Sequence, residues 1–483
     1  MRSTARIFAT LAAIEALSLL GFLYPQFAFT FFVFVAVGTA VLAFLYPRDF
    51  LYVTFVELAV GGMGYLFSAH IGGFTVSIRL AFFVIACAVA LYHGIKNRTL
   101  YTVTESALWG KWIWLAFFMA FGVIHGLLRG YNPRAVFFDF NAYFFLVYIW
   151  VWSVLMRTRE DLDALKPYAL AAVSFLAFKT ALIYFVFTHA VPLNVPLIYK
   201  WIRDTGVGEL TPAQGGFYRV FFQSHIYLII GWIYVMIALL KEKAHMRRWL
   251  LWGFSSFVVS ALIMSLSRSF ALGLVSAAGG MLFVSLVFWR FTMRETLHSA
   301  ALMIASVFGG VLIVLAITFW PYPARNPFSL SDAWGTRFTY DAAASSRWAE
   351  LSPLWNAVKD DWLLGAGFGK NITYISNDPR ARAENPSGEY TTSAFEWGYL
   401  DIWLKMGFFG LLVYLIILKN VFIGLFKSAH ACVLRGTWKG VLFPTTLMFS
   451  VVTLAVIHVF TPYLNHPLGF GVVILAAVWL DKK

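Results

Sequence analysis

Three arginines and one glutamate could act on an anionic substrate. Arg219 lies in YRVFFQSHIYL, Arg268 in SLSRSFALGL and Arg347 in SSRWAELSPLW, each beside an apolar segment or a helix start. A guanidinium stays charged at physiological pH and binds phosphate oxygens through two nitrogens at once. Glu396, in TTSAFEWGYL, lies where an apolar segment begins, and a carboxylate there suits a general base for a hydroxyl group. We therefore expect an anion clamp beside a base.

Each of these side chains also has an ordinary explanation at the edge of a membrane. Arginines commonly extend toward lipid headgroups or pair with nearby acids, and acids are common at the boundary of an apolar segment. Arg268 departs from that pattern, because Ser265, Ser267 and Ser269 surround it with small polar groups instead of aromatic side chains. The headgroup explanation is therefore weakest for Arg268.

Other ionisable residues lie in or beside apolar segments. His225, His466 and Tyr399 are secondary site candidates near external segment ends, although a lone histidine there is usually a hydrogen-bonded structural residue. Among the charged residues inside apolar segments, Glu57, Asp139 and Lys179 stand out as a second group. Such charges are usually paired, and Asp139 and Lys179 could pair because their segments are consecutive. No HExxH or CxxC pattern occurs, so we expect neither a metal nor a cofactor.

The elements that must position these residues are membrane-spanning helices. Of the 483 residues, 60% are hydrophobic and 12% are charged, with a mean hydropathy of +0.75, which excludes an ordinary soluble domain. A span needs about 20 mainly apolar residues. The candidates are 7–24, 27–46, 50–69, 78–95, 111–128, 136–156, 167–187, 221–240, 249–267, 269–289, 298–320, 398–418, 438–460 and 465–480. The sequence predicts an all-α polytopic membrane protein of about 12–14 transmembrane helices, with residues 1–483 as one integral membrane domain.

The net charge of +14 follows from this topology. If the N-terminus is cytoplasmic, most basic residues of the short connecting segments fall on the cytoplasmic side. We therefore expect both termini in the cytoplasm and no nucleic acid as partner. Two external segments are long enough to carry a site: a first loop at 188–220 and a large loop at 321–397, which we expect to contribute to catalysis.

The large external loop contains a helix and a glycine-rich turn. Ser345 or Ser346 could cap a helix whose apolar face is Trp348, Leu351, Trp355 and Val358. The stretch DDWLLGAGFGK (360–370) lacks the spacing and the βαβ context of a dinucleotide fingerprint. Its glycines are expected to form a tight turn, the hinge of an external lid, with Trp362, Leu363 and Leu364 anchoring it on the bundle.

These motifs resemble the O-antigen ligase and O-antigen polymerase superfamily of bacterial envelope proteins. SLSRSFALGL is similar to the family's Ser-Arg turn, and SSRWAELSPLWNAVKDDWLLGAGFGK to its Arg-x-x-x-Trp helix with a Gly-x-Gly-x-Gly end. YLDIWLKMGFFGLL is similar to its span after the loop, and YRVFFQSHIYL matches more loosely. The clear resemblance covers 215–280 and 340–415, in the family's order around one large external loop.

The resemblance implies metal-independent transfer of a glycan from undecaprenyl diphosphate to a sugar hydroxyl, as in lipopolysaccharide biosynthesis. The implied partners are the undecaprenyl-diphosphate-linked glycan, a glycan or lipid-linked acceptor, and the lipid of the bacterial cytoplasmic (inner) membrane, with the active face external. By position, Arg219, Arg268 and Arg347 would bind the diphosphate, whose developing charge fixed cations stabilise. Where the family often has His-Asn, this chain has Glu396 and Trp397, so a carboxylate would replace the imidazole as base. That departure disfavours a typical lipid A–core ligase.

Alternatives to this enzyme remain open at this point. A ligase and a polymerase use the same carrier and differ only in the acceptor. A transporter or flippase of lipid-linked saccharides would show internal repeats and broken spans, which we do not find in the sequence. A scaffold within an envelope assembly predicts no convergence of Arg219, Arg268, Arg347 and Glu396, so their placement in the fold discriminates among these classes.

Overall fold

The computed structural model describes residues 2–189, 191–289, 291–322, 324, 329–339, 342–436 and 438–482. Eleven helical segments in this part of the chain are long and apolar enough to cross a membrane. Helices suit that role because they satisfy their backbone hydrogen bonds within the segment. The predicted all-α polytopic membrane fold is confirmed.

The helices follow one another with short connections. In the first part of the chain they are α1 (Arg2–Leu23), α2 (Ala28–Leu45), α3 (Pro47–Val60), α4 (Ile78–Asn97), α5 (Trp109–Leu128), α6 (Pro133–Phe140), α7 (Tyr148–Leu155), α8 (Arg159–Asp163), α9 (Lys166–Thr188) and α10 (Val195–Asp204). The later helices are α11 (Ile226–Lys241), α12 (His245–Met264), α13 (Arg268–Val287), α14 (Met293–Phe319), α15 (Leu330–Thr339), α16 (Ala342–Asp360), α17 (Pro379–Glu384), α18 (Gly398–Leu434), α19 (Trp438–Ile457) and α20 (Pro467–Asp481).

Short 3₁₀ turns and three antiparallel hairpins complete the described fold. The 3₁₀ turns are η1 (Pro25–Phe27), η2 (Thr102–Glu105), η3 (Asn141–Val147), η4 (Gln223–His225) and η5 (Tyr463–Asn465). The hairpins pair β1 (Ser68–Ile71) with β2 (Phe74–Ser77), β3 (Gly208–Pro212) with β4 (Tyr218–Phe222), and β5 (Ile372–Ile375) with β6 (Glu389–Thr392).

All fourteen predicted spans have a helical counterpart, but three differ from a full apolar span. The segment predicted at 50–69 forms α3, which has only 14 residues, and 465–480 forms α20, which has 15. The segment at 249–267 forms α12, which begins with the polar sequence HMRR. These three are outside the eleven, whereas α18 continues to Leu434, well beyond its predicted end.

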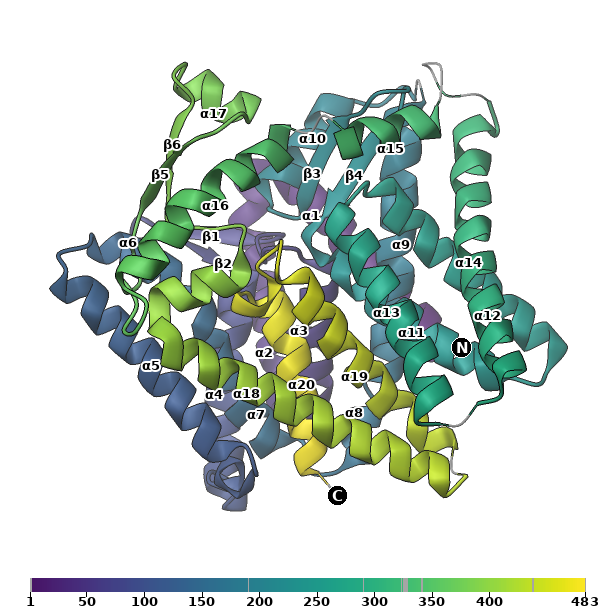
Figure 1. The fold of residues 1–483 in the computed structure, drawn as a ribbon, viewed down its shortest axis with the longest axis horizontal. Coiled ribbons are helices and arrows are strands. Elements are labelled where there is room, and N and C mark those ends of the chain that lie inside the picture. Colours follow the sequence, from purple (N-terminus) through teal and green to yellow (C-terminus); the bar gives the residue numbers. More distant parts are fainter. Residues whose placement is uncertain are drawn as a thin grey trace.

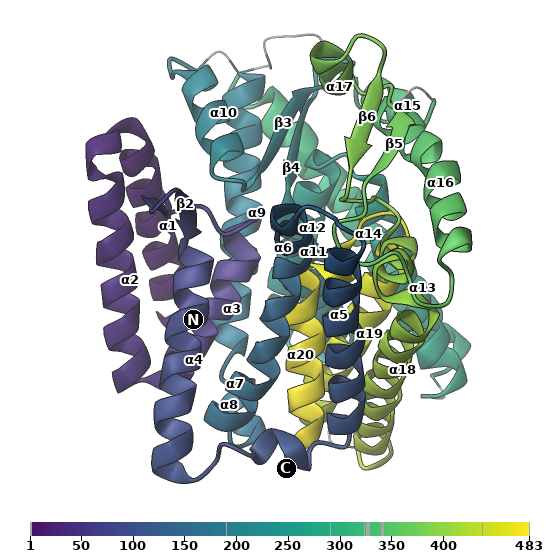
Figure 2. The same cartoon turned by 90° about the vertical axis from the view of Figure 1, so that its left-hand side faces the viewer.

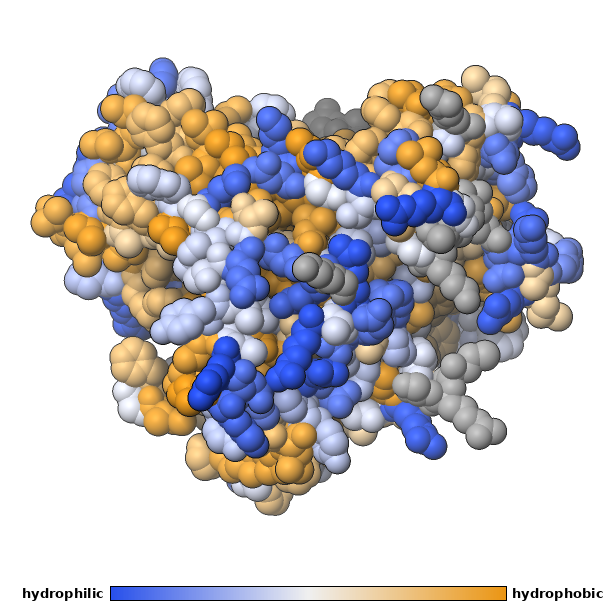
Figure 3. Space-filling model, turned by 90° about the horizontal axis from the view of Figure 1, so that it is seen from below, coloured by the Kyte–Doolittle hydropathy of each residue, from blue (hydrophilic) through white to orange (hydrophobic). Residues whose placement is uncertain are grey.

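The loops gather at one end of the bundle, which we call the loop-rich end. At the top of Figures 1 and 2 it consists of α10, β3–β4, α15, α16, β5–β6 and α17. Within the large loop predicted at 321–397, residues 323, 325–328 and 340–341 lie outside the described residues. The C-terminus lies at the opposite end, whose surface has a hydrophilic centre and an apolar margin (Figure 3). Polar ends and apolar flanks suit a chain that stands across a membrane.

The core of the bundle surrounds α20. Every residue of α20 from Leu468 to Trp479 is buried, as expected of a helix that is apolar on all sides and sits inside a large bundle. By contrast, α2 is equally apolar but buries only Phe32 and Ala43, so its surface is left for lipid. Figure 2 shows α20 between α5, α7 and α18.

The buried ion pairs differ from the predicted one. Buried pairs among the described residues include Lys179–Glu15, Lys405–Asp139, Lys405–Asp401 and Arg79–Glu57. Lys179 Nζ lies 2.6 Å from Glu15 Oε1, because α9 packs against α1. The predicted pair of Asp139 and Lys179 is therefore wrong: their spans are consecutive in the sequence, but the partners come from other helices.

Candidate active site

The structure joins Arg347 and Glu396 in an ion pair at the loop-rich end. Arg347 lies in the second turn of α16, and Glu396 lies two residues before α18. Arg347 Nη2 is 2.9 Å from Glu396 Oε2, with the two side chains 29% and 44% exposed. A pair this exposed contributes little to stability, because water competes for both charges. Both groups therefore remain accessible to a polar ligand.

Two further bonds fix the backbone around Glu396. Glu350 Oε2 accepts the Glu396 backbone N–H at 3.2 Å, and the Arg347 carbonyl accepts Trp397 Nε1–H at 2.9 Å. The rings of Trp348 and Trp397 also meet at a centroid distance of 5.2 Å. The main chain at Glu396 is thus held against α16, while its carboxylate stays half exposed.

Glu350 is a buried carboxyl that the sequence analysis did not single out. It is 1% exposed. Burial raises the pKa of Glu350 to about 7; the charges of Glu396 and Asp401 also raise it, whereas the bond from the Glu396 N–H and the Arg347 charge lower it. Its signal in the sequence is its spacing: three residues after Arg347, it lies on the same helix face.

Arg219 and Arg268 meet at a second place, the turn between α12 and α13. Arg268 is the first residue of α13, and Leu266 before it adopts a left-handed backbone with φ 44°. Arg219, on β4, donates its Nε–H to the Ser265 carbonyl at 3.0 Å. Its guanidinium lies 4.6 Å from the centre of the Phe221 ring. The hairpin β3–β4 thus places Arg219 at the serine-flanked turn of Arg268.

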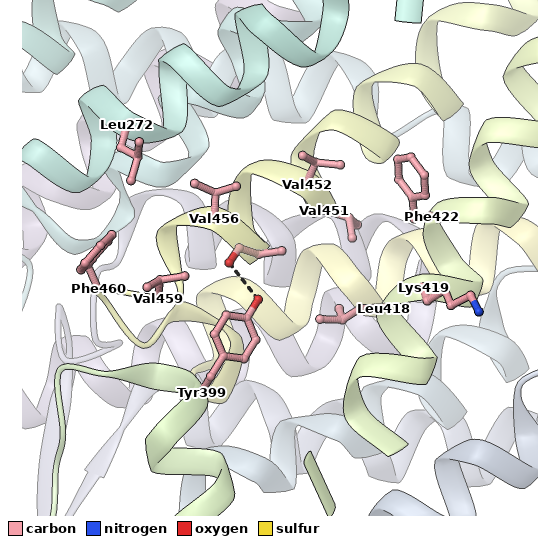
Figure 4. A pocket seen from close by; sticks show the side chains of 11 residues that line it. Leu272, Tyr399, Leu418, Lys419, Phe422, Val451, Val452, Val456, Val459 and Phe460 are labelled. Carbon is pink, nitrogen blue, oxygen red and sulfur yellow. Dashed lines mark hydrogen bonds between the residues drawn. The ribbon is translucent and has the colours of Figure 1, made fainter. Parts of the chain in front are cut away.

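An apolar groove lies between α13, α18 and α19 (Figure 4). Its volume is about 460 Å³, and α13, α18 and α19 form its walls. At one end Leu272 lies one helical turn after Arg268, and Phe460 packs on Trp397 with a ring distance of 5.5 Å. Lys419 lies at the other end (Figure 4). The groove therefore begins beside both arginine regions.

The chemistry of the groove suits part of a hydrocarbon chain. Along α19 and the residues after it, the lining runs from Val451 to Phe460, roughly 13 Å at about 1.5 Å per residue. Tyr399 lines the groove but donates its hydroxyl to the Ala455 carbonyl at 2.8 Å (Figure 4). The ring of Tyr399 thus presents an apolar surface to the groove, which contributes packing and no free hydroxyl donor.

The two histidine candidates have structural hydrogen bonds. His225 is fully buried, with its Nε2 2.9 Å from Thr180 Oγ1. His466 Nδ1 accepts the Leu468 N–H at 3.3 Å and so caps α20. Neither these contacts nor that of Tyr399 reach Arg347 or Glu396, so the structure does not bring the secondary candidates to the ion pair.

The glycine-rich turn 365–369 is wedged into the bundle. Gly365, Gly367 and Gly369 have φ angles of 77°, 89° and 85°, which confirms the predicted tight turn. A Cβ on Gly365 would lie 2.5 Å from Gly407 N, and one on Gly367 2.5 Å from Gly126 N. Glycine is needed because backbone meets backbone at these positions. The turn has no space for a phosphate.

Three backbone amides of the turn donate hydrogen bonds to neighbouring parts of the bundle. Ala366 N–H donates to the Leu404 carbonyl at 2.6 Å, Phe368 N–H to the Gly122 carbonyl at 3.1 Å, and Gly369 N–H to Asp139 Oδ2 at 2.8 Å. Ala366 and Phe368 are fully buried. The turn is therefore a fixed plug rather than the predicted hinge of a lid.

The predicted anchors of this turn reach the bundle only in part, through the Trp362 ring, which lies 6.3 Å from the Phe408 ring of α18. The side chains of Trp362, Leu363 and Leu364 are all exposed, because the turn inserts its small and aromatic residues, Ala366 and Phe368, instead. The acids before the turn have a separate role. Asp361 pairs with Arg129 at the end of α5, and this hydrogen-bonded pair lowers the pKa of Asp361.

A buried charge cluster lies under the turn. Lys405 Nζ pairs with the carboxylates of Asp139 and Asp401, and Asn465 donates its side-chain amide to Asp401. All three charged side chains are buried. This cluster joins α6, α18 and η5, and Asp139 also accepts the Gly369 N–H. The i, i+4 spacing of Asp401 and Lys405 was the signal for it in the sequence.

The predicted apolar face of α16 is confirmed in part. Val358 of that face is buried together with Leu354, whereas Trp348 and Trp355 are largely exposed. Ser345 and Ser346 lie inside the helix, which begins at Ala342, so neither caps it. Tryptophans are common at a membrane boundary, where they need not point into the bundle.

Metal binding has no evident site here. Among the residues that the structure describes, no three His, Cys, Asp or Glu side chains form a group that could hold a metal ion. The polar groups of the candidate site are instead the arginines and carboxylates described above.

One segment of the sequence matches a known protein family. Residues 253–415 match the family model described as O-antigen ligase. The matched segment includes Arg268, Arg347, Glu396 and the glycine turn, whereas Arg219 and His466 lie outside it. A comparison with curated proteins gives no match. The resemblance stated from the motifs is confirmed over this segment, which is about one third of the chain.

Proposed function

We propose, from the match of residues 253–415 to the O-antigen ligase family model, that this enzyme transfers a glycan from undecaprenyl diphosphate to a sugar hydroxyl. The reaction would take place at the external face of the bacterial cytoplasmic membrane, with the loop-rich end outside. A glycan or a lipid-linked saccharide would be the acceptor. The protein would need no metal for this transfer.

The observation that supports this proposal most directly is the position of the apolar groove. A polyprenyl diphosphate is a long hydrocarbon chain with an anionic head. The groove offers an apolar surface for the part of the hydrocarbon chain next to the head, and one end of it lies beside the turn of Arg268 and the Arg347–Glu396 pair. A carrier lying in the groove would place its diphosphate among cations, which stabilise the charge that develops on a leaving diphosphate.

In the first step of the proposed reaction, the diphosphate takes the place of Glu396 as the ion-pair partner of Arg347. A diphosphate oxygen replaces the Glu396 carboxylate on the guanidinium, while Arg268 and Arg219 hold the other side of the anion. Glu396 is then free to take the proton of the acceptor hydroxyl, whose oxygen attacks the anomeric carbon. The bond from that carbon to the diphosphate oxygen breaks, and its electrons stay on undecaprenyl diphosphate. Glu350 keeps the Glu396 backbone in place during the exchange.

The test is a deletion strain complemented with Arg268→Ala, followed by analysis of glycan chain length. Loss of long chains with one repeat still attached would indicate a polymerase, and loss of all attached repeats would indicate a ligase. Arg435→Ala is the matched control, because Arg435 is exposed at the far end of α18. Full complementation by Arg268→Ala, at equal protein level, would contradict the role given to Arg268.

A transporter or flippase of lipid-linked saccharides is the second candidate. The buried cluster of Lys405, Asp139 and Asp401 favours it, since charges inside a bundle commonly mark a transport pathway. Proteoliposomes that contain the purified protein, donor and acceptor distinguish the two. An enzyme forms a new glycan bond with donor and acceptor on the same side, whereas a flippase only moves the donor across the membrane.

A further inference from the structure

We propose that the hairpin β5–β6 carries a subsite for a pyranose ring of the glycan substrate, with Tyr374 and Tyr390 as its stacking surface. This inference rests on the proposed function and specifies how the same site would bind sugar. The ring in question belongs either to the donor glycan or to the acceptor, next to the bond that is formed.

The two tyrosines form one aromatic surface. Tyr374 and Tyr390 are directly paired across the hairpin, with ring centroids 5.8 Å apart and an interplanar angle of 78°. Tyr374 is half-buried, and Tyr390 is 39% exposed. An edge-to-face pair fixes the orientation of each ring. Tyr374 therefore holds the Tyr390 ring in place, and the exposed part of that ring is accessible to a ligand from solvent.

The tyrosines lie on the hairpin face that turns toward α16. Side chains two residues apart share a face of a strand, so Ile372 and Tyr374 lie on the same side. Ile372 is buried in a cluster with Leu354 and Val358 of α16. The residues of the other face are exposed: Thr373, Ile375, Glu389 and Thr391. The aromatic surface thus borders the helix that carries Arg347.

Hydrogen bonds hold the end of β5 at the residue before Arg347. Ser346 Oγ lies 2.9 Å from Ser376 Oγ and accepts the Asn377 N–H at 2.9 Å. The carboxylates of the ion-pair region are near as well. Burial and then the negative charge of Glu350 raise the pKa of Tyr374, and Glu396 adds to the effect.

A pyranose ring matches this combination of groups. One face of the ring presents C–H groups, which pack on the electron-rich face of an aromatic side chain. Its hydroxyls donate hydrogen bonds to carboxylates such as those beside Tyr374. Since the sugar that reacts must lie at Arg347 and Glu396, a neighbouring aromatic surface would orient its ring for the transfer.

The test compares binding of two lipid probes to the purified full-length protein in lipid nanodiscs. One probe is undecaprenyl diphosphate without sugar, and the other is the lipid-linked glycan extracted from the deletion strain. Tyr390→Leu is expected to bind the bare carrier like the wild type but the glycan-bearing carrier roughly threefold to tenfold more weakly. Tyr390→Phe keeps the ring and should retain most of the affinity. Thr391→Val, on the opposite face of the hairpin, is the control.

The outcomes separate the two sources of the sugar. Weaker binding of the lipid-linked glycan assigns the subsite to the donor. Unchanged donor binding, with weaker binding of the unmodified acceptor glycan from the same deletion strain, assigns it to the acceptor. Tyr390→Leu that binds all three probes like the wild type overturns the inference, and so does an equal loss for the bare carrier. If the wild-type protein binds neither lipid probe, the proposed function fails instead.

Discussion

The Lys405 cluster and the Arg347–Glu396 pair are two groups of charges that differ in their exposure to solvent. Lys405 is buried with Asp139 and Asp401, and the three residues link α6, α18 and the glycine turn. Arg347 and Glu396 form a single pair whose side chains are 29% and 44% exposed. If a buried ion pair loses one partner, the other charge stays in the protein interior without compensation, which is strongly destabilising. An exposed pair can exchange partners, so the first cluster holds the fold while the second is suited to act on a ligand.

The largest expected effect breaks the buried cluster. Lys405→Met leaves two carboxylates without their cation, and we expect a loss of about 3–5 kcal/mol in the free energy of unfolding. Thermal unfolding of the purified protein in detergent measures it as a lower midpoint. Lys427→Met, on the exposed side of the same helix, should stay within about 0.5 kcal/mol. Equal midpoints for the two variants would show that the cluster does not hold the fold.

The next prediction concerns variants that break the Arg347–Glu396 pair, which should change the rate of glycan transfer. Arg347→Ala is expected to lower the transfer rate about 10²- to 10³-fold, with a change in unfolding free energy of at most about 1 kcal/mol. Arg347→Lys keeps the positive charge but lacks the planar guanidinium that binds two oxygens at once. It should therefore recover only part of the wild-type transfer rate. Product formation in proteoliposomes gives the rate, with Arg435→Ala as control. A wild-type rate in Arg347→Ala would remove Arg347 from the site.

A smaller effect tests whether the glycine turn is a plug. Gly367→Ala would bring a Cβ within 2.5 Å of Gly126 N at a φ of 89°, whereas Gly130→Ala has a similar φ of 77° and no atom within 4 Å. We expect a loss of about 1 kcal/mol for Gly130→Ala from backbone strain alone. Gly367→Ala should lose roughly 2–3 kcal/mol. Similar losses in thermal unfolding would mean that close backbone approach adds nothing.

The last effect appears only as the pH changes and concerns Glu350, which lies between the two clusters. Its pKa is raised from 4.5 to about 7 in the folded protein, so the folded state binds this proton more tightly than the unfolded state. Stability from this group is therefore fully present below pH 4.5 and is lost as the pH rises to 7, by about 3 kcal/mol. Unfolding midpoints across this range should fall less in Glu350→Gln than in wild type. Glu389→Gln, exposed on β6, should follow the wild type.

Residue type and position predicted part of the site. Arg347 and Glu396 were expected to serve one site because each lies beside an apolar segment on the same side, and the structure joins them. Glu350 was missed, because nothing in its type shows that it will be buried. The membrane spans were predictable because lipid requires long apolar helices.

Contacts between distant helices were not predictable from the pattern. Asp139 pairs with Lys405 rather than with Lys179, because packing of the bundle, and not the order of spans, decides which helices touch. The glycine turn was recognised as a turn from its composition. Its insertion against Gly126 depends on a partner helix more than 200 residues earlier, which no local pattern reveals.

The groove of Figure 4 lies on the flank of the bundle, between α13, α18 and α19, rather than in a central channel. A lipid carrier held there would arrive and depart sideways, within the bilayer, while its polar sugars approach from the water above. The hydrocarbon chain would then move within the membrane plane, while the sugars approach along the membrane normal. The chain would not have to enter water, and the sugars would not have to enter lipid. A spent carrier could then diffuse away in the membrane plane without disturbing the plug at the glycine turn.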